Sequence, residues 1–172
     1  MNNQKGYLLL ESVVSLLVIS ILILLMYSLL VFSINLKETA EDRVELQQQA
    51  IEVSKKIEDI IENSVKIENI GCNSGEFSSV KSIKCKYIYR GDVKFKEGTK
   101  EIILKDSRSK LFINSFSPTT GEMGEYEIGD YVDEMRVAIS NNGACANVIL
   151  KLSKNKQKYE TRLTIYLKSL HA

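Results

Sequence analysis

Residues 5–36 read KGYLLLESVVSLLVISILILLMYSLLVFSINL and form the most apolar segment of the chain. Between Glu11 and Lys37 there is no charged residue and no histidine. As a helix, the 23 residues from Ser12 to Ile34 would measure roughly 35 Å, which is enough to cross a bilayer core. The segment is therefore predicted to be a membrane helix. Glu11 stands out because a carboxylate that enters hydrocarbon without a partner costs a few kcal/mol.

Two general explanations fit an apolar N-terminal segment, namely a cleaved secretory signal peptide and a single-pass anchor. The apolar region of a signal peptide runs for roughly 7–15 residues and ends at a small-residue cleavage site. This run is longer, and no site of the A-x-A type precedes Lys37. A single-pass anchor fits better, but neither explanation gives Glu11 a purpose.

The stretch KGYLLLE at positions 5–11 resembles the class III signal of type IV pilins and pseudopilins. In that family a short basic leader ends in Gly, and an aromatic residue or Met, three further residues, a Glu and a long apolar run follow. The resemblance covers the six-residue leader and the helix through Leu36, with Tyr7 in place of the commoner Phe and Leu8 in place of a frequent Thr. It implies that a prepilin peptidase cleaves between Gly6 and Tyr7 and that the new α-amine of Tyr7 is methylated.

The resemblance also gives Glu11 a role in assembly. Cleavage after Gly6 would leave a charged amine on Tyr7 at the head of an apolar helix, and Glu11 is a second charge in the same segment. Two unpaired charges in an apolar medium are costly, whereas a pair costs much less. In the family, the glutamate of an incoming subunit neutralises the N-terminal amine of its neighbour, which fixes one axial register. The helix dipole also favours an anion in the first turn.

By this resemblance the chain is expected to be a structural subunit, a minor pilin or pseudopilin that helps initiate or cap a type IV pilus-like fibre. Its distal part looks most like that of the J-type minor pseudopilins, without a motif that fixes the assignment. The implied partners are other pilin or pseudopilin subunits, the prepilin peptidase, the inner-membrane assembly platform and membrane lipid. The implied location is the bacterial cytoplasmic membrane, with a single span and the C-terminal domain outside, and then a cell-surface pilus or pseudopilus. The sequence leaves open whether the fibre serves twitching, protein secretion or DNA uptake.

Two other functions compete with this one. A non-polymerising membrane-anchored binding protein, such as an adhesin or a sensor ectodomain, would keep Met1, whereas cleavage after Gly6 removes it. An anchored enzyme would need a reactive centre, but the sequence has no Gly-rich phosphate loop, no Cys/His metal spacing and no histidine placed for a triad. Its single histidine, His171, is next to the C-terminus. The chain is therefore predicted not to be an enzyme, and no cofactor or metal site is expected.

The helix is predicted to continue beyond the apolar segment. Residues 38–63 contain neither Gly nor Pro. Apolar residues recur there at 4-3-4-3 spacing, which predicts one buried stripe of an amphipathic helix. The stripe consists of Leu46, Ala50, Val53, Ile57 and Ile60, with Ile51, Ile61 and Val65 beside it. Asn69 and Gly71 give a stop signal, so one helix of roughly 90 Å is expected from about Tyr7 to about Glu68.

From Lys84 onward the hydrophobic pattern changes to period two, which predicts β-strands. The candidate strands are Lys84–Arg90, Val93–Lys96, Glu101–Lys105, Leu111–Phe116, Met135–Ser140, Asn147–Leu152 and Tyr159–Leu167. The predicted turns are Gly91-Asp92, Asn142-Gly143 and Lys154–Gln157, and Ser117–Gly124 is the predicted loop. Sequential hairpins imply an antiparallel meander of about five to seven strands with one face on the helix.

Together these patterns predict an α+β fold with a long N-terminal helix. Its apolar half is expected to be transmembrane, and its C-terminal half is expected to pack on an antiparallel β-sheet rather than in a coiled coil. This is the lollipop arrangement of the pilins. The predicted segments are a leader peptide at 1–6, a membrane or fibre-core half of the helix at 7–36, an amphipathic half at 37–70 and a globular β domain at 71–172.

Three cysteines allow at most one disulfide and leave one free thiol. Cys72 and Cys85 lie close together in the sequence beyond the membrane segment, and they are the predicted pair. Cys145 is then expected to be free. In a reducing compartment three buried thiols are expected instead.

Two sets of charged residues could serve a binding function or could simply be exposed surface residues. One predicted strand face carries the lysines Lys84, Lys86, Lys94 and Lys96. A solvated sheet face is favoured over a phosphate-contacting patch for DNA, because charge at strand period is usual on an exposed face. Asp130, Asp133 and Glu134 could ligate calcium, but they lack the spacing of a known calcium loop and are interpreted as surface acids.

Overall fold

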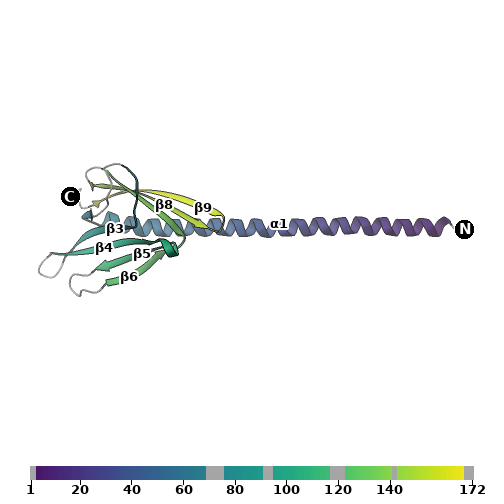
Figure 1. Cartoon of the computed structure of the whole chain (residues 1–172), viewed down its shortest axis with the longest axis horizontal. Coiled ribbons are helices and arrows are strands. Elements are labelled where there is room, and N and C mark those ends of the chain that lie inside the picture. The colour runs from purple at the N-terminus through teal and green to yellow at the C-terminus, as the bar shows by residue number, and fades with distance from the viewer. Residues whose placement is uncertain (1–2, 69–75, 91–94, 117–122, 141–142, 169–172) are drawn as a thin grey trace. The chain divides into compact units, whose positions relative to one another are not determined.

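The computed structural model describes residues 3–68, 76–90, 95–116, 123–140 and 143–168. A single long helix, α1 (Asn3–Glu62), is followed by strands that form antiparallel sheets (Figure 1). By its internal contacts the chain divides into two compact units, residues 1–41 and residues 42–172.

The first unit contains the N-terminal part of α1, and all of its described side chains are exposed. Its large apolar residues point to every side of the helix. Two serines of this segment donate hydrogen bonds within the helix: Ser15 to the Glu11 carbonyl and Ser20 to the Leu16 carbonyl, both at 2.8 Å. By length and composition, α1 is able to span a membrane or to act as a signal.

In the second unit, α1 packs against the sheets through one apolar stripe. All five stripe positions predicted from the spacing are buried, and so is Ile61 beside them. Ile51 is 65% exposed and does not belong to the buried face. Each fully buried Leu or Ile side chain contributes about 1.5–3 kcal/mol. The predicted α+β fold, with a long apolar N-terminal helix packed on antiparallel sheets, is confirmed, and the architecture is pilin-like.

The helix ends earlier than predicted. Its last residue is Glu62, and the next residues form strand β1 (Lys66–Glu68) instead of a further helical turn. The Val65 amide donates to the Lys86 carbonyl at 2.8 Å, which starts the pairing of β1 with β3. Pairing with a distant strand therefore decides where the helix stops.

Two sheets account for the strands that the structure describes. The remaining strands are β2 (Ser78–Ser79), β3 (Ser82–Arg90), β4 (Phe95–Lys105), β5 (Lys110–Phe116), β6 (Met123–Gly129), β7 (Val132–Ser140), β8 (Cys145–Lys154) and β9 (Gln157–Tyr166), and a 3-10 helix, η1 (Asp106–Arg108), follows β4. One sheet has the order β1-β3-β4-β5-β6 and the other β2-β7-β8-β9, with every neighbouring pair antiparallel. The Val80 amide donates to Met135 in β7 (2.9 Å), and the Lys81 carbonyl accepts from Leu104 in β4 (2.8 Å), so the segment before β3 links the two sheets.

This arrangement differs from the predicted single meander, because β1, β2 and β6 were not predicted and the strands divide between two sheets. Two of the predicted turns are present. The β7–β8 hairpin pairs Ser140 with Cys145, with Gly143 at φ +95°, and the β8–β9 hairpin turns at Asn155. The Gly91-Asp92 turn lies outside the described residues, as does most of the predicted loop before β6.

Strand β6 approaches α1 closely at its C-terminal end. A Cβ atom on Gly129 would overlap the Val53 side chain, so only glycine fits there without movement of the helix or strand. One residue earlier, the Ile128 carbonyl accepts a hydrogen bond from Lys56 Nζ at 3.2 Å. The approach of the Gly129 backbone to Val53 and the hydrogen bond from Lys56 together fix the distance between the helix and the sheet.

Candidate functional site

The residues predicted for processing and assembly lie near the start of α1, in the purple part of Figure 1. Gly6 and Tyr7 are consecutive residues of the helix, and the Tyr7 side chain is 70% exposed. Glu11 follows Tyr7 by four positions, which places both on the same face one turn apart. The Glu11 side chain is exposed as well.

Glu11 forms no ion pair with any side chain that the structure describes. The first ion pair along the described part of the helix joins Lys37 and Glu41 at 3.6 Å, beyond the apolar segment. Glu11 is therefore a carboxylate in an uncovered apolar segment, and the described part of its own chain supplies no cation for it.

A second polar cluster surrounds Lys154 at the β8–β9 turn. Its Nζ lies 2.5 Å from Glu45 Oε2 and 3.0 Å from Asp42 Oδ1, both on α1, and 5.4 Å from the centre of the Tyr131 ring. The Tyr131 hydroxyl donates to Glu45 Oε1 at 2.9 Å, and Asn155 Nδ2 donates to Asp42 Oδ2 at 2.7 Å. We call these five residues the collar. They join α1 to the connections β6–β7 and β8–β9.

The backbone around the collar is unusual. Within the described residues, the non-glycine positions with positive φ are Ser109 (49°), Tyr131 (65°) and Asn155 (52°). Tyr131 and Asn155 belong to the collar. Backbone hydrogen bonds link the segments that contain the three residues: the Val132 amide donates to the Ser109 carbonyl (2.8 Å), and the Ser153 amide donates to the Tyr131 carbonyl (2.9 Å). A left-handed residue other than Gly or Asn costs roughly 1–2 kcal/mol. Such positions persist only where the surrounding contacts determine them.

The electrostatics of the collar follow from these contacts. The hydrogen bonds from Asn155 and Lys154 lower the pKa of Asp42, and those from Lys154 and Tyr131 lower the pKa of Glu45. The two carboxylates in turn raise the pKa of Lys154, with Glu45 as the larger cause. The hydrogen bond to Glu45 also raises the pKa of Tyr131. Each charge thus stabilises the ionised form of its partner around neutral pH.

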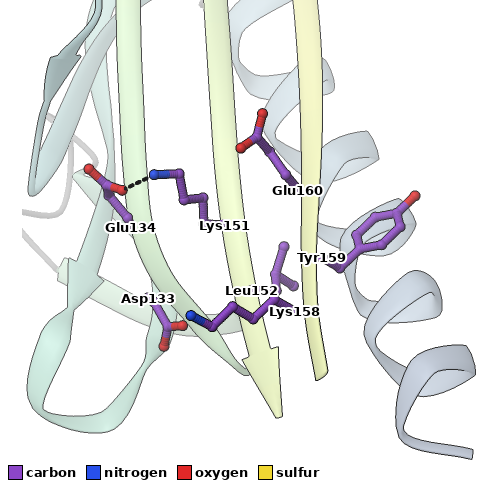
Figure 2. Close-up of a pocket in the computed structure, with 7 residues that line it drawn as sticks. All are labelled: Asp133, Glu134, Lys151, Leu152, Lys158, Tyr159 and Glu160. Atoms are coloured by element: carbon purple, nitrogen blue, oxygen red, sulfur yellow. Dashed lines mark hydrogen bonds and ion pairs between the residues drawn. The ribbon is translucent and has the colours of Figure 1, made fainter. Parts of the chain in front are cut away.

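A pocket of about 320 Å³ opens on the four-stranded sheet near the same end. It is lined by Asp133, Glu134, Lys151, Leu152, Lys158, Tyr159 and Glu160 (Figure 2). A β-bulge in β7 lies between Val132 and Glu134. Glu134 accepts hydrogen bonds from Arg136 (2.6 Å) and Lys151 (2.7 Å), and these contacts lower its pKa. The lining mixes three acids with two lysines, so the pocket favours neither an anion nor a cation.

Two of the lysines singled out in the sequence pair with acids on neighbouring strands. Lys84 lies 3.8 Å from Glu101, and Lys86 lies 2.9 Å from Glu68. An acid therefore neighbours each of these lysines, as is typical of a solvated sheet face. Lys94 and the side chain of Lys96 lie outside the described residues.

The three acids considered for calcium have separate partners. Asp130 is paired with Lys110 at 3.0 Å, Asp133 accepts a hydrogen bond from Ser109 at 3.3 Å, and Glu134 pairs as described above. Among the described residues, no group of three or more His, Cys, Asp or Glu side chains is arranged to hold a metal ion.

Two of the three cysteines lie in the described part of the chain. Cys85 and Cys145 are both buried and form no disulfide with each other. Burial raises the pKa of the Cys85 thiol to about 12, against the opposing effect of the Ser64 hydroxyl. Cys72 lies outside the described residues, so the Cys72–Cys85 disulfide stays a prediction.

Comparison with known proteins supplies no family for this chain. No family model matches it, and no curated protein matches it significantly. Any assignment therefore depends on the motif at positions 5–11 and on the architecture.

The collar was not predicted from the sequence. Lys154 and Glu45 are 109 positions apart, and Asn155 and Asp42 are 113 apart. One signal was available, because Asp42 and Glu45 immediately precede the apolar stripe on the face that reaches the β domain. Their partners follow from the tertiary fold alone.

Proposed function

We propose that this chain is a structural subunit of a type IV pilus-like fibre, a minor pilin or pseudopilin that helps initiate or cap assembly. In this proposal a prepilin peptidase removes residues 1–6, and the subunit is held in the bacterial cytoplasmic membrane with its β domain outside. It then enters a cell-surface pilus or pseudopilus. Its partners are membrane lipid, the inner-membrane assembly platform and other pilin or pseudopilin subunits.

The observation that carries the proposal is the unpaired carboxylate of Glu11. It lies one helical turn after the Gly6–Tyr7 junction and has no cationic partner among the described side chains of its own chain. Cleavage at that junction would create a positive amine on Tyr7. A neighbouring subunit displaced along the helix axis would then bring its amine to Glu11, so that two costly charges become one pair.

The rest of the apolar segment supports the same proposal. Large apolar side chains are exposed around the whole helix between Tyr7 and Leu36. A helix that is apolar on every side requires an apolar environment, which is lipid before assembly and neighbouring helices in a fibre. A plain anchor needs the lipid only, and Glu11, which has no cationic partner among the described side chains, would then bring a cost without a benefit.

The test separates membrane insertion from fibre incorporation. Glu11→Ala and Glu11→Gln are expressed beside wild-type copies of the other subunits, and the membrane and sheared-fibre fractions are compared by immunoblot. Both variants should insert and be cleaved after Gly6. Their recovery in fibres should fall roughly tenfold or more, because an amine buried without its partner costs about 3–5 kcal/mol.

Glu41→Ala is the matched control, since it removes a carboxylate from the same helix beyond the apolar segment. It should enter fibres as the wild type does. Normal fibre recovery of Glu11→Ala would contradict the proposal. If the wild-type protein keeps Met1 and stays in the membrane fraction, a non-polymerising anchored binding protein is the better description.

A further inference from the structure

The docking of α1 changes character at residues 42–45. From Leu46 onward the helix is held by buried apolar side chains. In the turn before Leu46 no side chain is buried, and Val44 is 52% exposed. This turn contacts the β domain through Asp42 and Glu45, whose partners are the other members of the collar.

We propose that the collar is a charge-operated latch on helix residues 42–45. When closed, it holds this turn against the β6–β7 and β8–β9 connections. The latch opens when the charge of Lys154 is screened or removed. The apolar core stays folded while the latch is open. The proposal concerns the second unit alone and does not depend on fibre assembly.

Residues 42–45 can detach locally because their detachment exposes little apolar surface. Detaching residues 42–45 breaks ion pairs and hydrogen bonds but uncovers no core side chain, whereas detaching residues 46–61 would expose the whole stripe. Segments held by few apolar contacts open at a lower free energy than the global transition. The Glu45 side chain is 43% exposed, so dissolved ions can screen its pairing with Lys154.

The closed state is also specifically built. Tyr131 and Asn155 are held in left-handed backbone conformations, and both place their polar groups on a helix carboxylate. Asn adopts this conformation readily, so the backbone strain falls on Tyr131, and strain of this kind is often associated with switching elements. Lys110 is already paired with Glu127 at 2.8 Å and with Asp130 at 3.0 Å, so it offers no replacement for Lys154.

Limited proteolysis of the full chain in detergent micelles tests the latch. Trypsin cuts after Arg43 only when that turn of the helix opens, and cuts after Lys55 and Lys56 report opening of the docked stripe. In Lys154→Met, cleavage after Arg43 should be about fivefold faster or more, because the cleavage rate follows the population of the open form. Cleavage after Lys55 and Lys56 should change by less than about twofold.

Two further variants control this result. Lys168→Met removes an ion pair to Glu62 at the other end of the docked helix (3.0 Å) and should leave the rate at Arg43 unchanged. Lys154→Arg keeps the charge and should restore most of the protection. Equal rates at Arg43 in wild type and Lys154→Met would overturn the proposal, and so would a parallel rise at Lys55 and Lys56.

Salt provides a second measurement on the unmodified protein. Raising the salt concentration from about 0.05 to 1 M shortens the screening length to roughly 3 Å. Cleavage after Arg43 in the wild type, normalised to an unfolded peptide substrate, should then rise while cleavage after Lys55 and Lys56 does not. A rate at Arg43 that does not respond to salt would overturn the proposal, and this series decides alone if Lys154→Met does not fold.

Discussion

The two parts of α1 belong to one continuous helix but differ in how their apolar residues are buried. Residues 7–36 are almost entirely apolar, yet every described side chain there is exposed. Residues 46–61 contain fewer apolar side chains, yet six of them are buried against the sheets. The arrangement of apolar residues explains the difference: a single stripe fits one sheet surface, whereas an apolar surface on every side does not. In the proposed function, the first part obtains its surroundings from lipid or from neighbouring subunits.

Alanine substitutions should separate the two parts most strongly. Ile57 is fully buried and Ile23 is 62% exposed. Ile57→Ala should lower the free energy of unfolding of the β domain by about 2–5 kcal/mol, because it leaves a cavity in the core. Ile23→Ala should leave that free energy unchanged. Urea unfolding of the full chain in micelles, followed by tyrosine near-UV circular dichroism, measures both, and equal effects would break the distinction.

The close approach of β6 to the docked half of the helix gives a second prediction. Gly129→Ala should cost about 1–3 kcal/mol, because the added methyl overlaps Val53. In a Val53→Ala background the same substitution should cost less than about 1 kcal/mol, since the obstructing atoms are gone. A double-mutant cycle from urea unfolding measures the difference. The same cost in both backgrounds would show that the contact does not limit the packing.

A pair of serines near the docked helix should give the smallest effect. The Ser64 hydroxyl donates to the Ile61 carbonyl at 2.7 Å, whereas the buried Ser54 hydroxyl has no hydrogen-bond partner in the described part of the chain. Ser64→Ala should cost about 1 kcal/mol. Ser54→Ala should be neutral or slightly stabilising, because alanine is the better helix former. A larger loss for Ser54→Ala than for Ser64→Ala in the same unfolding assay would contradict this assignment.

Patterns within short stretches of sequence predicted the elements that depend on neighbouring residues in the chain. The 4-3-4-3 spacing identified Leu46, Ala50, Val53, Ile57 and Ile60 as the buried stripe, and all five are buried. The predicted lysine face of β3 carries Lys84 and Lys86, which are half-buried, whereas the alternate residues Cys85 and Tyr87 are buried. Asn142-Gly143 correctly marked the turn between β7 and β8.

The features that were missed depend on partners far away in the sequence. Residues 63–68 contain no Gly or Pro that would stop a helix, but the pairing of residues 66–68 with β3 forms β1 there. Strand β6 was hidden by glycines at both ends, and Gly129 is there because α1 passes so close to it. The collar unites a helix turn with two connections that no sequence period links. Of the candidate site, positions 6, 7 and 11 were predicted from a motif, and the collar could be found only in three dimensions.

The mass of the mature protein tests the central claim most directly. The claim is that the apolar part of α1 is completed by another subunit through the charge pair of Glu11 with a new amine on Tyr7, and removal of the leader is its first requirement. Intact mass spectrometry of the protein extracted from membranes of cells with an active prepilin peptidase should give a chain of residues 7–172, with or without one added methyl group. A mature chain that begins at Met1 under those conditions would contradict the account.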